Sequence, residues 1–159
     1  MIEPVVYITD HDYSRVVGGA FAEGARCPTS TVDEWKDGSP VVYGILRGCE
    51  RIIKRAGWIG RSWLHIDHGY FRRGHFEGYY RISKNGLQAS GWTESDNTGP
   101  ARWMNLRVRV KPWRLSGEHI VVVPITPAMG MFFGVHPNDW LMAVLAELKR
   151  LTDRPIRVH

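Results

Sequence analysis

The residues best suited to chemistry gather in one stretch, residues 63–83, which reads WLHIDHGYFRRGHFEGYYRIS. It holds three of the chain's seven histidines, and Asp67 stands between His65 and His68. A carboxylate and an imidazole at the end of a strand can supply a base and the group that orients it. We therefore predict Asp67 and His68 as the catalytic residues of an acid–base site. The alternative, in which Asp67 caps a turn and His65 fills the core, stays open.

The same stretch raises the question of a metal ion, because histidine and aspartate are common metal ligands. Side chains alternate along a strand, so His65 and Asp67 point to one face and His68 points to the other. These three side chains cannot meet at one ion, and the sequence contains no HExxH motif or comparable spacing. We predict no metal site and no cofactor.

A mixture of arginines and aromatic residues follows directly, in residues 70–81 (YFRRGHFEGYYR). Guanidinium groups form paired hydrogen bonds with phosphate, and aromatic rings stack on bases. We predict that a phosphate-bearing ligand binds here, and in the alternative interpretation the aromatic rings fill the core of a strand–loop–strand segment. The predicted ligand-binding residues of this region are Tyr70, Arg72, Arg73 and Arg81.

Apolar runs that alternate with helical patterns must position these residues. Buried strands are expected at residues 4–8, 41–46, 63–66, 79–82, 120–124 and 155–158. Helices are expected at residues 15–24 and 47–56 and from Asn138 onward, with Asn138 as the cap, and residues 126–135 (TPAMGMFFGV) as a loop. Near-continuous apolar strands separated by helices are typical of a parallel sheet that is buried on both faces. We predict a three-layer, Rossmann-like α/β fold with a mostly parallel sheet.

This fold class predicts where a ligand would bind, because parallel sheets bind ligands beyond the carboxyl ends of their strands. The first expected strand leads to Asp10 and His11, the second to Arg47, and the third to Asp67 and His68. We therefore predict a single crevice at this edge, in which Asp10, His11 and Arg47 contact the ligand.

The bulk composition is that of an ordinary globular protein, with 159 residues, 43% hydrophobic and 23% charged. We predict a single domain over residues 1–159, with a soft seam near residues 111–118, where Lys, Pro, Arg, Ser and Gly cluster. The net charge of +5 is a mild bias toward anionic ligands and gives only weak support for nucleic acid as a partner.

Several other classes of protein are disfavoured by the sequence. Two cysteines are too few for a disulfide framework, and the chain shows neither a signal peptide nor an apolar run of membrane-spanning length. It also lacks the GxSxG, P-loop and GxGxxG motifs of acyl transfer and nucleotide cradling. We expect a cytoplasmic protein without membrane contact, and the residues leave open whether it is an enzyme.

Several longer motifs carry a resemblance. They are VVYITDHDYSRVVGGAF, VVYGILRG, WLHIDHGYF, GYYRISKNGLQ, KPWR, IVVVPITPA and DWL…LKRLTDRPIRV, which together span the chain. The pattern resembles a family of bacteriophage proteins that look like GT-B-type glycosyltransferases. The resemblance implies a protein of the cytoplasm of a bacterial host that binds a nucleotide sugar or another phosphate-bearing ligand.

The resemblance also implies a departure from the transferase pattern. In a GT-B enzyme, a second Rossmann-like lobe supplies most contacts to the sugar nucleotide, and we would expect it to follow the segment RPIRV. The sequence ends there, so we expect a degenerate or incomplete glycosyltransferase-like protein that binds its ligand. The alternative is a non-catalytic phage or prophage protein that binds and inhibits a host macromolecule, such as a component of a defence system, through residues 70–81.

Overall fold

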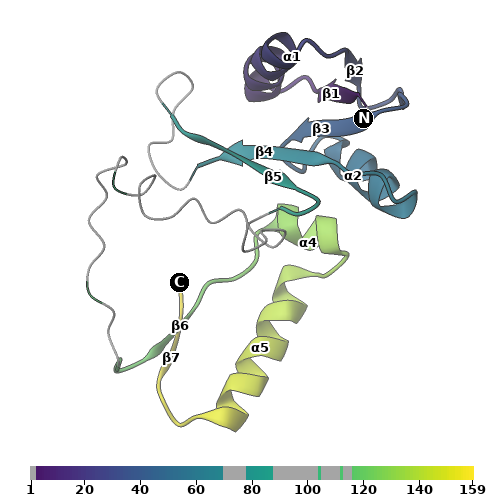
Figure 1. The fold of residues 1–159 in the computed structure, drawn as a ribbon. Coiled ribbons are helices and arrows are strands. Elements are labelled where there is room, and N and C mark those ends of the chain that lie inside the picture. Colours follow the sequence, from purple (N-terminus) through teal and green to yellow (C-terminus); the bar gives the residue numbers. More distant parts are fainter. Residues whose placement is uncertain (1–2, 70–77, 88–103, 105–111, 113–115) are drawn as a thin grey trace. The chain divides into compact units, whose positions relative to one another are not determined.

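The computed structural model describes residues 3–69, 78–87, 104, 112 and 116–159. The chain divides into two compact units, Met1–Asn97 and Thr98–His159 (Figure 1). This division lies ahead of the seam expected near residues 111–118. The single domain over residues 1–159 stays a prediction. No helix in the described part of the chain is long and apolar enough to cross a membrane.

The first unit is built on a five-stranded sheet. Its strands are β1 (Pro4–Ile8), β2 (Thr29–Thr31), β3 (Ser39–Tyr43), β4 (Leu64–His68) and β5 (Tyr80–Lys84). They lie side by side in the order β2-β1-β3-β4-β5, and only the β4–β5 pair is antiparallel. The prediction of a mostly parallel sheet is confirmed.

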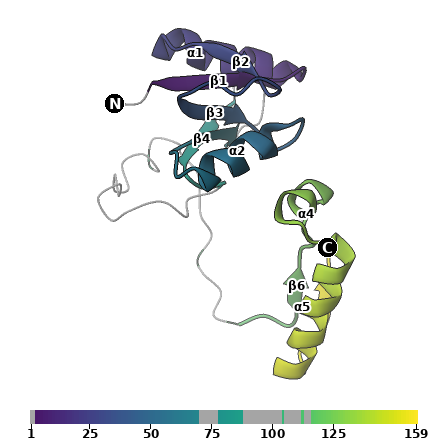
Figure 2. The same ribbon diagram turned by 90° about the vertical axis from the view of Figure 1, so that its right-hand side faces the viewer.

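Helices cover both faces of this sheet. A π-helical turn, η1 (Ser14–Gly18), continues into α1 (Gly19–Ala25) and links β1 to β2, whereas α2 (Cys49–Trp58) links β3 to β4. The two crossovers run in opposite directions across the sheet, and crossovers of one hand then place their helices on opposite faces. Figures 1 and 2 show this arrangement. The predicted three-layer α/β fold is therefore confirmed.

The core forms where alternate strand residues meet the helices. On the α1 face, Val6, Val41 and Ile66 from three neighbouring strands pack against Ala22. Burying apolar side chains such as these stabilises the fold by roughly 1.5–3 kcal/mol each. Because side chains alternate along a strand, the neighbours of these residues face α2, which buries Ile52 and Ile53 among others.

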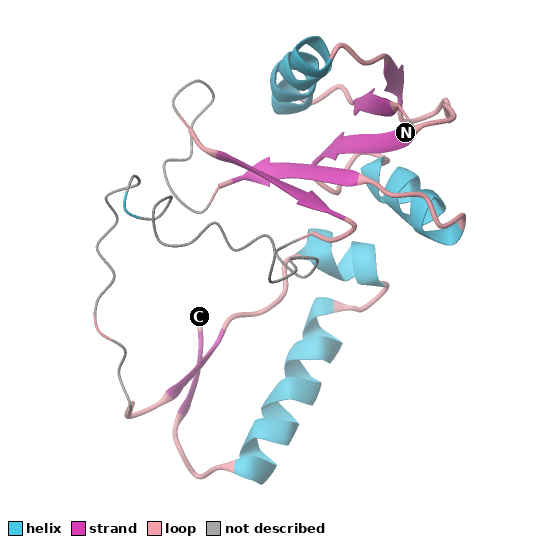
Figure 3. Ribbon diagram, in the orientation of Figure 1, coloured by secondary structure: helices cyan, strands magenta, loops and turns pink. Residues whose placement is uncertain are grey.

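The second unit is a βαβ arrangement. Strand β6 (Ile120–Val122) pairs in parallel with β7 (Ile156–Val158), and the chain between them forms α4 (Pro127–Phe133) and α5 (Pro137–Leu151), drawn in cyan in Figure 3. The strands expected at residues 120–124 and 155–158 are confirmed as β6 and β7, and the last expected helix is confirmed as α5.

The loop expected at residues 126–135 is wrong, because most of that segment is α4. Thr126 caps this helix, since its Oγ1 accepts a hydrogen bond from the Met129 amide at 3.3 Å, and Pro127 occupies the first turn. Gly134 ends it in the left-handed conformation, with φ at 69°.

The cap expected at Asn138 is also wrong. Helix α5 begins one residue earlier, with Pro137 in its first turn and His136 at the capping position. A proline fits there because its missing N–H would have no helical partner, and its fixed φ already suits the helix.

Candidate ligand-binding site

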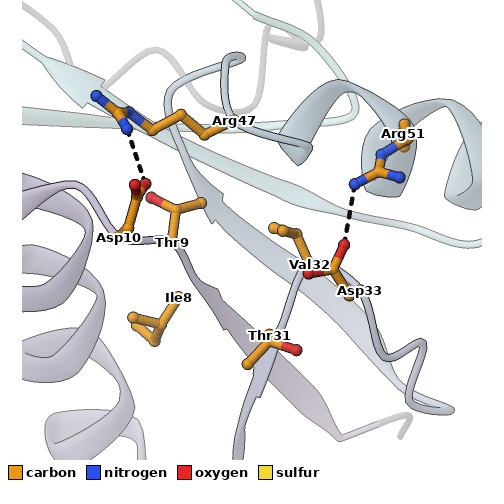
Figure 4. A pocket seen from close by; sticks show the side chains of 8 residues that line it. All are labelled: Ile8, Thr9, Asp10, Thr31, Val32, Asp33, Arg47 and Arg51. Carbon is orange, nitrogen blue, oxygen red and sulfur yellow. Dashed lines mark hydrogen bonds and ion pairs between the residues drawn. The ribbon is translucent and has the colours of Figure 1, made fainter.

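A cavity of about 380 Å³ lies at the carboxyl edge of the first unit's sheet. Its volume falls at the lower end of the range of small-molecule sites, roughly 300–1,000 Å³. The walls come from the ends of β1 and β2 and from the start of α2 (Figure 4). Eight residues line it: Ile8, Thr9, Asp10, Thr31, Val32, Asp33, Arg47 and Arg51.

Two ion pairs dominate the polar lining. Arg47 Nη1 lies 2.8 Å from Asp10 Oδ1, and Arg51 Nη2 lies 3.1 Å from Asp33 Oδ1 (Figure 4). Each of these four side chains is more than half exposed. Exposed ion pairs contribute only about 0–1 kcal/mol, because water screens them. A ligand can therefore exchange its own charges for these contacts at little energetic cost.

The turn between β3 and α2 places Arg47 at the cavity. Gly44, Arg47 and Gly48 all have positive φ, at 71°, 57° and 91°. At Gly48 a Cβ atom would lie 2.9 Å from Cγ2 of Val32, so only glycine lets the start of α2 approach the end of β2 this closely. The cavity thus depends on a close contact between two segments far apart in the sequence.

The turn after β1 is fixed by its own hydrogen bonds. The Thr9 amide donates to Ser14 Oγ at 3.0 Å, and the His11 amide donates to Thr9 Oγ1 at 3.3 Å. Ser14 is fully buried, so this bond ties the end of the strand to the first turn of η1. Asp10 is thereby held at the rim, next to Arg47, as the strand-end argument predicted for these two residues.

Next to the same edge lies an aromatic cluster of five side chains. Tyr13 meets His68 edge-on, with ring centroids 4.7 Å apart, and His68 stacks on Tyr80 at 5.7 Å. The hydroxyl of Tyr43 lies 2.9 Å from His68 Nε2. The aromatic cluster consists of His11, Tyr13, Tyr43, His68 and Tyr80.

Tyr43 is held in its protonated form within this cluster. Burial raises the pKa of Tyr43 well above its ordinary value, and the negative charge of Asp67 adds to the effect. The hydroxyl therefore keeps its proton over the physiological pH range, and it can donate to the His68 ring or accept from it. The arrangement gives His68 a partner that orients its imidazole.

Asp67 and His68 lie on opposite faces of β4, as strand alternation requires. Asp67 Oδ2 lies 3.2 Å from Arg81 Nη2 on β5, and its Oδ1 accepts a hydrogen bond from the backbone amide of His68 at 2.7 Å. The ring of His68 is bonded instead to Tyr43. A catalytic role for Asp67 or His68 stays a prediction.

His65 shares the Asp67 face and is almost completely buried. Burial lowers the pKa of His65 below its ordinary value of 6.5, and the charge of Asp67 opposes this effect. Within the described ranges, no three His, Cys, Asp or Glu side chains are grouped closely enough to hold a metal ion.

The predicted ligand-binding residues are thus only partly brought together. Asp10 and Arg47 line the cavity, His11 belongs to the aromatic cluster, and Arg81 pairs with Asp67. Tyr70, Arg72 and Arg73 lie outside the described residues.

Sequence reasoning missed five charged or aromatic residues of this edge. The candidates did not include Asp33 and Arg51 in the cavity or Tyr13, Tyr43 and Tyr80 in the aromatic cluster. Asp33 follows a strand that lacks an apolar pattern, so no signal identified it. Tyr43 lies inside the apolar run of residues 41–46, so the sequence did not mark it as the end of a strand.

Comparisons with known proteins give no relative for the chain: no family model, curated protein or solved structure matches it.

Proposed function

We propose that the first unit binds a phosphate-bearing ligand of the nucleotide type in the cavity at the carboxyl edge of its sheet. The observation that carries this proposal is the pair of arginines, Arg47 and Arg51, in the wall of a cavity of about 380 Å³. Guanidinium groups match phosphate oxygens in both charge and geometry, and their present partners are held by weak, exposed contacts.

The position in the fold supports the same ligand class. The cavity adjoins the end of β1, where α1 and α2 leave the sheet toward opposite faces, and ligands of doubly wound sheets bind at such points. Arg47 lies in the turn that leads into α2, next to the N-cap residue Gly48.

A sugar nucleotide is one member of this ligand class, and the resemblance to GT-B-type glycosyltransferases in bacteriophages favours it. Binding to a host macromolecule through residues 70–81 is the alternative. That segment lies mostly outside the described residues.

The test is isothermal titration of the full chain with inorganic phosphate, nucleoside monophosphates and diphosphates, and nucleotide sugars. We expect a nucleotide to bind, and Arg47→Ala and Arg51→Ala each to weaken binding by roughly 10- to 100-fold, the loss of a charged hydrogen bond.

The matched control is Arg15→Ala. Arg15 is as exposed as Arg47, at 53% against 51%, and it also pairs with an aspartate, Asp12, but it does not line the cavity. The control should bind like the unsubstituted chain. Failure of every compound to bind, or an equal loss with Arg15→Ala, would overturn the proposal.

A further inference from the structure

The tryptophan at the end of α2 is exposed to an extent that the fold does not require. Trp58 is 91% exposed, more than any other large apolar side chain in the described part of the chain. A Cβ atom on Gly60, two residues further along, would meet no atom within 4 Å apart from those of its chain neighbours, so the surface here is open. Single apolar residues are common on protein surfaces, so Trp58 needs a second observation before it indicates a binding site.

The second observation is a row of basic residues on the same side of α2. At 3.6 residues per turn, three basic positions and Trp58 fall within an arc of about 100° around the helix. All four side chains are exposed. The one acidic residue of α2, Glu50, lies beside this arc and accepts a hydrogen bond from the Gly48 amide at 3.1 Å. The α2 stripe consists of Arg51, Lys54, Arg55 and Trp58.

A second indole holds one of these basic side chains in place. The guanidinium carbon of Arg55 lies over the ring of Trp35, 4.5 Å from its centroid, in a cation–π contact. Trp35 belongs to the connection between β2 and β3, and its ring also lies against Tyr7, with centroids 6.2 Å apart. A guanidinium that rests on a ring keeps the N–H donors at its edge for an oxygen acceptor. Arg55 is therefore a positioned donor within the stripe.

Basic side chains beside an open indole fit single-stranded nucleic acid. Arginine and lysine contact its phosphates, and an indole stacks on its bases, which are not covered by a second strand. An acidic peptide would meet the charges but has no need of a stacking surface. A membrane surface requires a broad apolar face, whereas the apolar residues Ile52, Ile53 and Ala56 of α2 are buried.

We propose that the first unit binds single-stranded nucleic acid, whose backbone runs from the cavity along the α2 stripe and of which one base stacks on Trp58. This inference rests on the proposed function, because Arg51 belongs both to the cavity lining (Figure 4) and to the stripe. Arg51 and Trp58 are seven residues apart in the sequence, which is about 10 Å along a helix. Stacked nucleotides advance by about 3.4 Å each, so a strand of roughly four nucleotides spans this distance.

The experiment measures the affinity of the full chain for 5′-phosphorylated oligothymidylates and oligouridylates of increasing length, from the mononucleotide to roughly eight nucleotides. We expect the affinity to rise about tenfold or more up to roughly four nucleotides and to change little beyond, since one stacked base contributes about that much. The two series show whether the strand is DNA or RNA, and a rise in either supports the inference.

Two substitutions of Trp58 separate stacking from simple apolar contact. Trp58→Leu keeps an apolar side chain without a ring, so it should remove the gain with length. Trp58→Phe keeps a ring face and should retain most of that gain. Both should bind the mononucleotide like the unsubstituted chain, and the exposure of Trp58 means that neither disturbs the core.

Lys54→Ala should weaken the binding of the longer strands and reduce the slope of log affinity against log salt by about 0.7, the effect of one phosphate contact. Its matched control is Lys149→Ala, an exposed lysine of the second unit with the same change of charge, which should leave that slope unchanged.

Equal affinity for all lengths, or a gain with length that survives Trp58→Leu, overturns the inference but leaves the proposed function standing. Tighter binding of polyglutamate or of phosphatidylserine vesicles than of the longer strands would overturn it as well. Failure of the mononucleotides and of all longer strands to bind overturns both proposals.

Discussion

The two edges of the five-stranded sheet use the same side-chain chemistry in different surroundings. At the carboxyl edge, Arg47 pairs with Asp10 beside a cavity. At the amino edge, Arg61 pairs with Asp37 at the same distance, 2.8 Å, in the segments that lead into β4 and β3. An arginine–aspartate pair is therefore not evidence of a site by itself. What surrounds the pair decides its role.

The amino edge is closed by local bonds and tight packing. The Ser39 amide donates to the Glu3 carbonyl at 2.9 Å, and the Trp63 amide donates to Asn85 Oδ1 at 3.0 Å. A Cβ atom on Gly38 would lie 2.5 Å from Cγ2 of Val5, so this edge has no room for an added methyl group. These two amides already have partners, and a ligand would have to displace them.

The largest expected effect is on the free energy of unfolding. It compares a tyrosine bonded to the closed amino edge with a tyrosine near the open carboxyl edge, where the cavity lies. Tyr7 is fully buried, and its hydroxyl oxygen accepts a hydrogen bond from the Lys36 amide at 2.9 Å. Lys36 lies in the connection between β2 and β3, which returns the chain to the amino edge. Tyr7→Phe leaves this amide without its acceptor, so we expect a loss of about 1–3 kcal/mol in the free energy of unfolding. Tyr43→Phe, near the open edge, should cost about 0.5–1.5 kcal/mol, the net value of one hydrogen bond.

Urea unfolding at neutral pH, followed by circular dichroism, measures both values. Hydrogen exchange of peptides from β1 and β3 then assigns each loss to the first unit. An equal cost for the two substitutions would contradict the contrast between the closed and open edges.

The sequence predicted most of the sheet because the inner strands are apolar. Residues 4–8 and 41–46 are recognisable from their β-branched runs, and the structure shifts the second by only a few residues. Strand β2 was missed because its sequence, TST, is polar and short, and only pairing with β1 makes it a strand. Tertiary pairing of this kind is not visible in a local pattern.

The candidate site was predicted in part for the same reason. The rule of carboxyl strand ends located Asp10 and Arg47, since both follow recognisable strands. The same rule could not locate Asp33, because Asp33 follows β2, the strand that the sequence did not reveal. The contact between Tyr43 and His68 depends on register, because Tyr43 pairs with Ile66 and so meets the side chain two residues further along β4.

The pH dependence of the free energy of unfolding should test whether His65 on β4 is buried away from water. Burial lowers the pKa of His65, so the unfolded chain takes up a proton near pH 6.5 while the folded chain does so only at lower pH. Between these two values the unfolded state binds more protons, and the free energy of unfolding falls as the pH falls. Below the folded pKa the contribution levels off.

Urea unfolding at a series of pH values between about 7.5 and 5 measures this effect. This interval spans roughly the ordinary range of histidine pKa values. His65→Gln should flatten the dependence, whereas His136→Gln, a histidine of the other unit, should leave it in place. A dependence that persists in His65→Gln would mean that the burial of His65 is not its cause.

The smallest expected effect concerns the Arg47–Asp10 pair at the carboxyl edge and the Arg61–Asp37 pair at the amino edge. It separates the roles of these two ion pairs most directly. Arg61 is only 22% exposed, whereas Arg47 is 51% exposed. Asp37→Asn should therefore cost up to about 1 kcal/mol of stability, and Asp10→Asn should cost less than about 0.5 kcal/mol, because water replaces the partner of Arg47 more easily.

In ligand titrations Asp10→Asn should have the larger effect on affinity, although it has the smaller effect on stability. Asp10→Asn removes a competitor for Arg47 and a repulsive charge, so the affinity for a nucleoside monophosphate should rise by up to roughly fivefold, which corresponds to about 1 kcal/mol. Asp37→Asn should leave that affinity unchanged. If both substitutions raised it equally, the gain would come from overall charge and not from the cavity. A gain confined to Asp10→Asn would mean that Asp10 competes with the phosphate for Arg47 at the carboxyl edge.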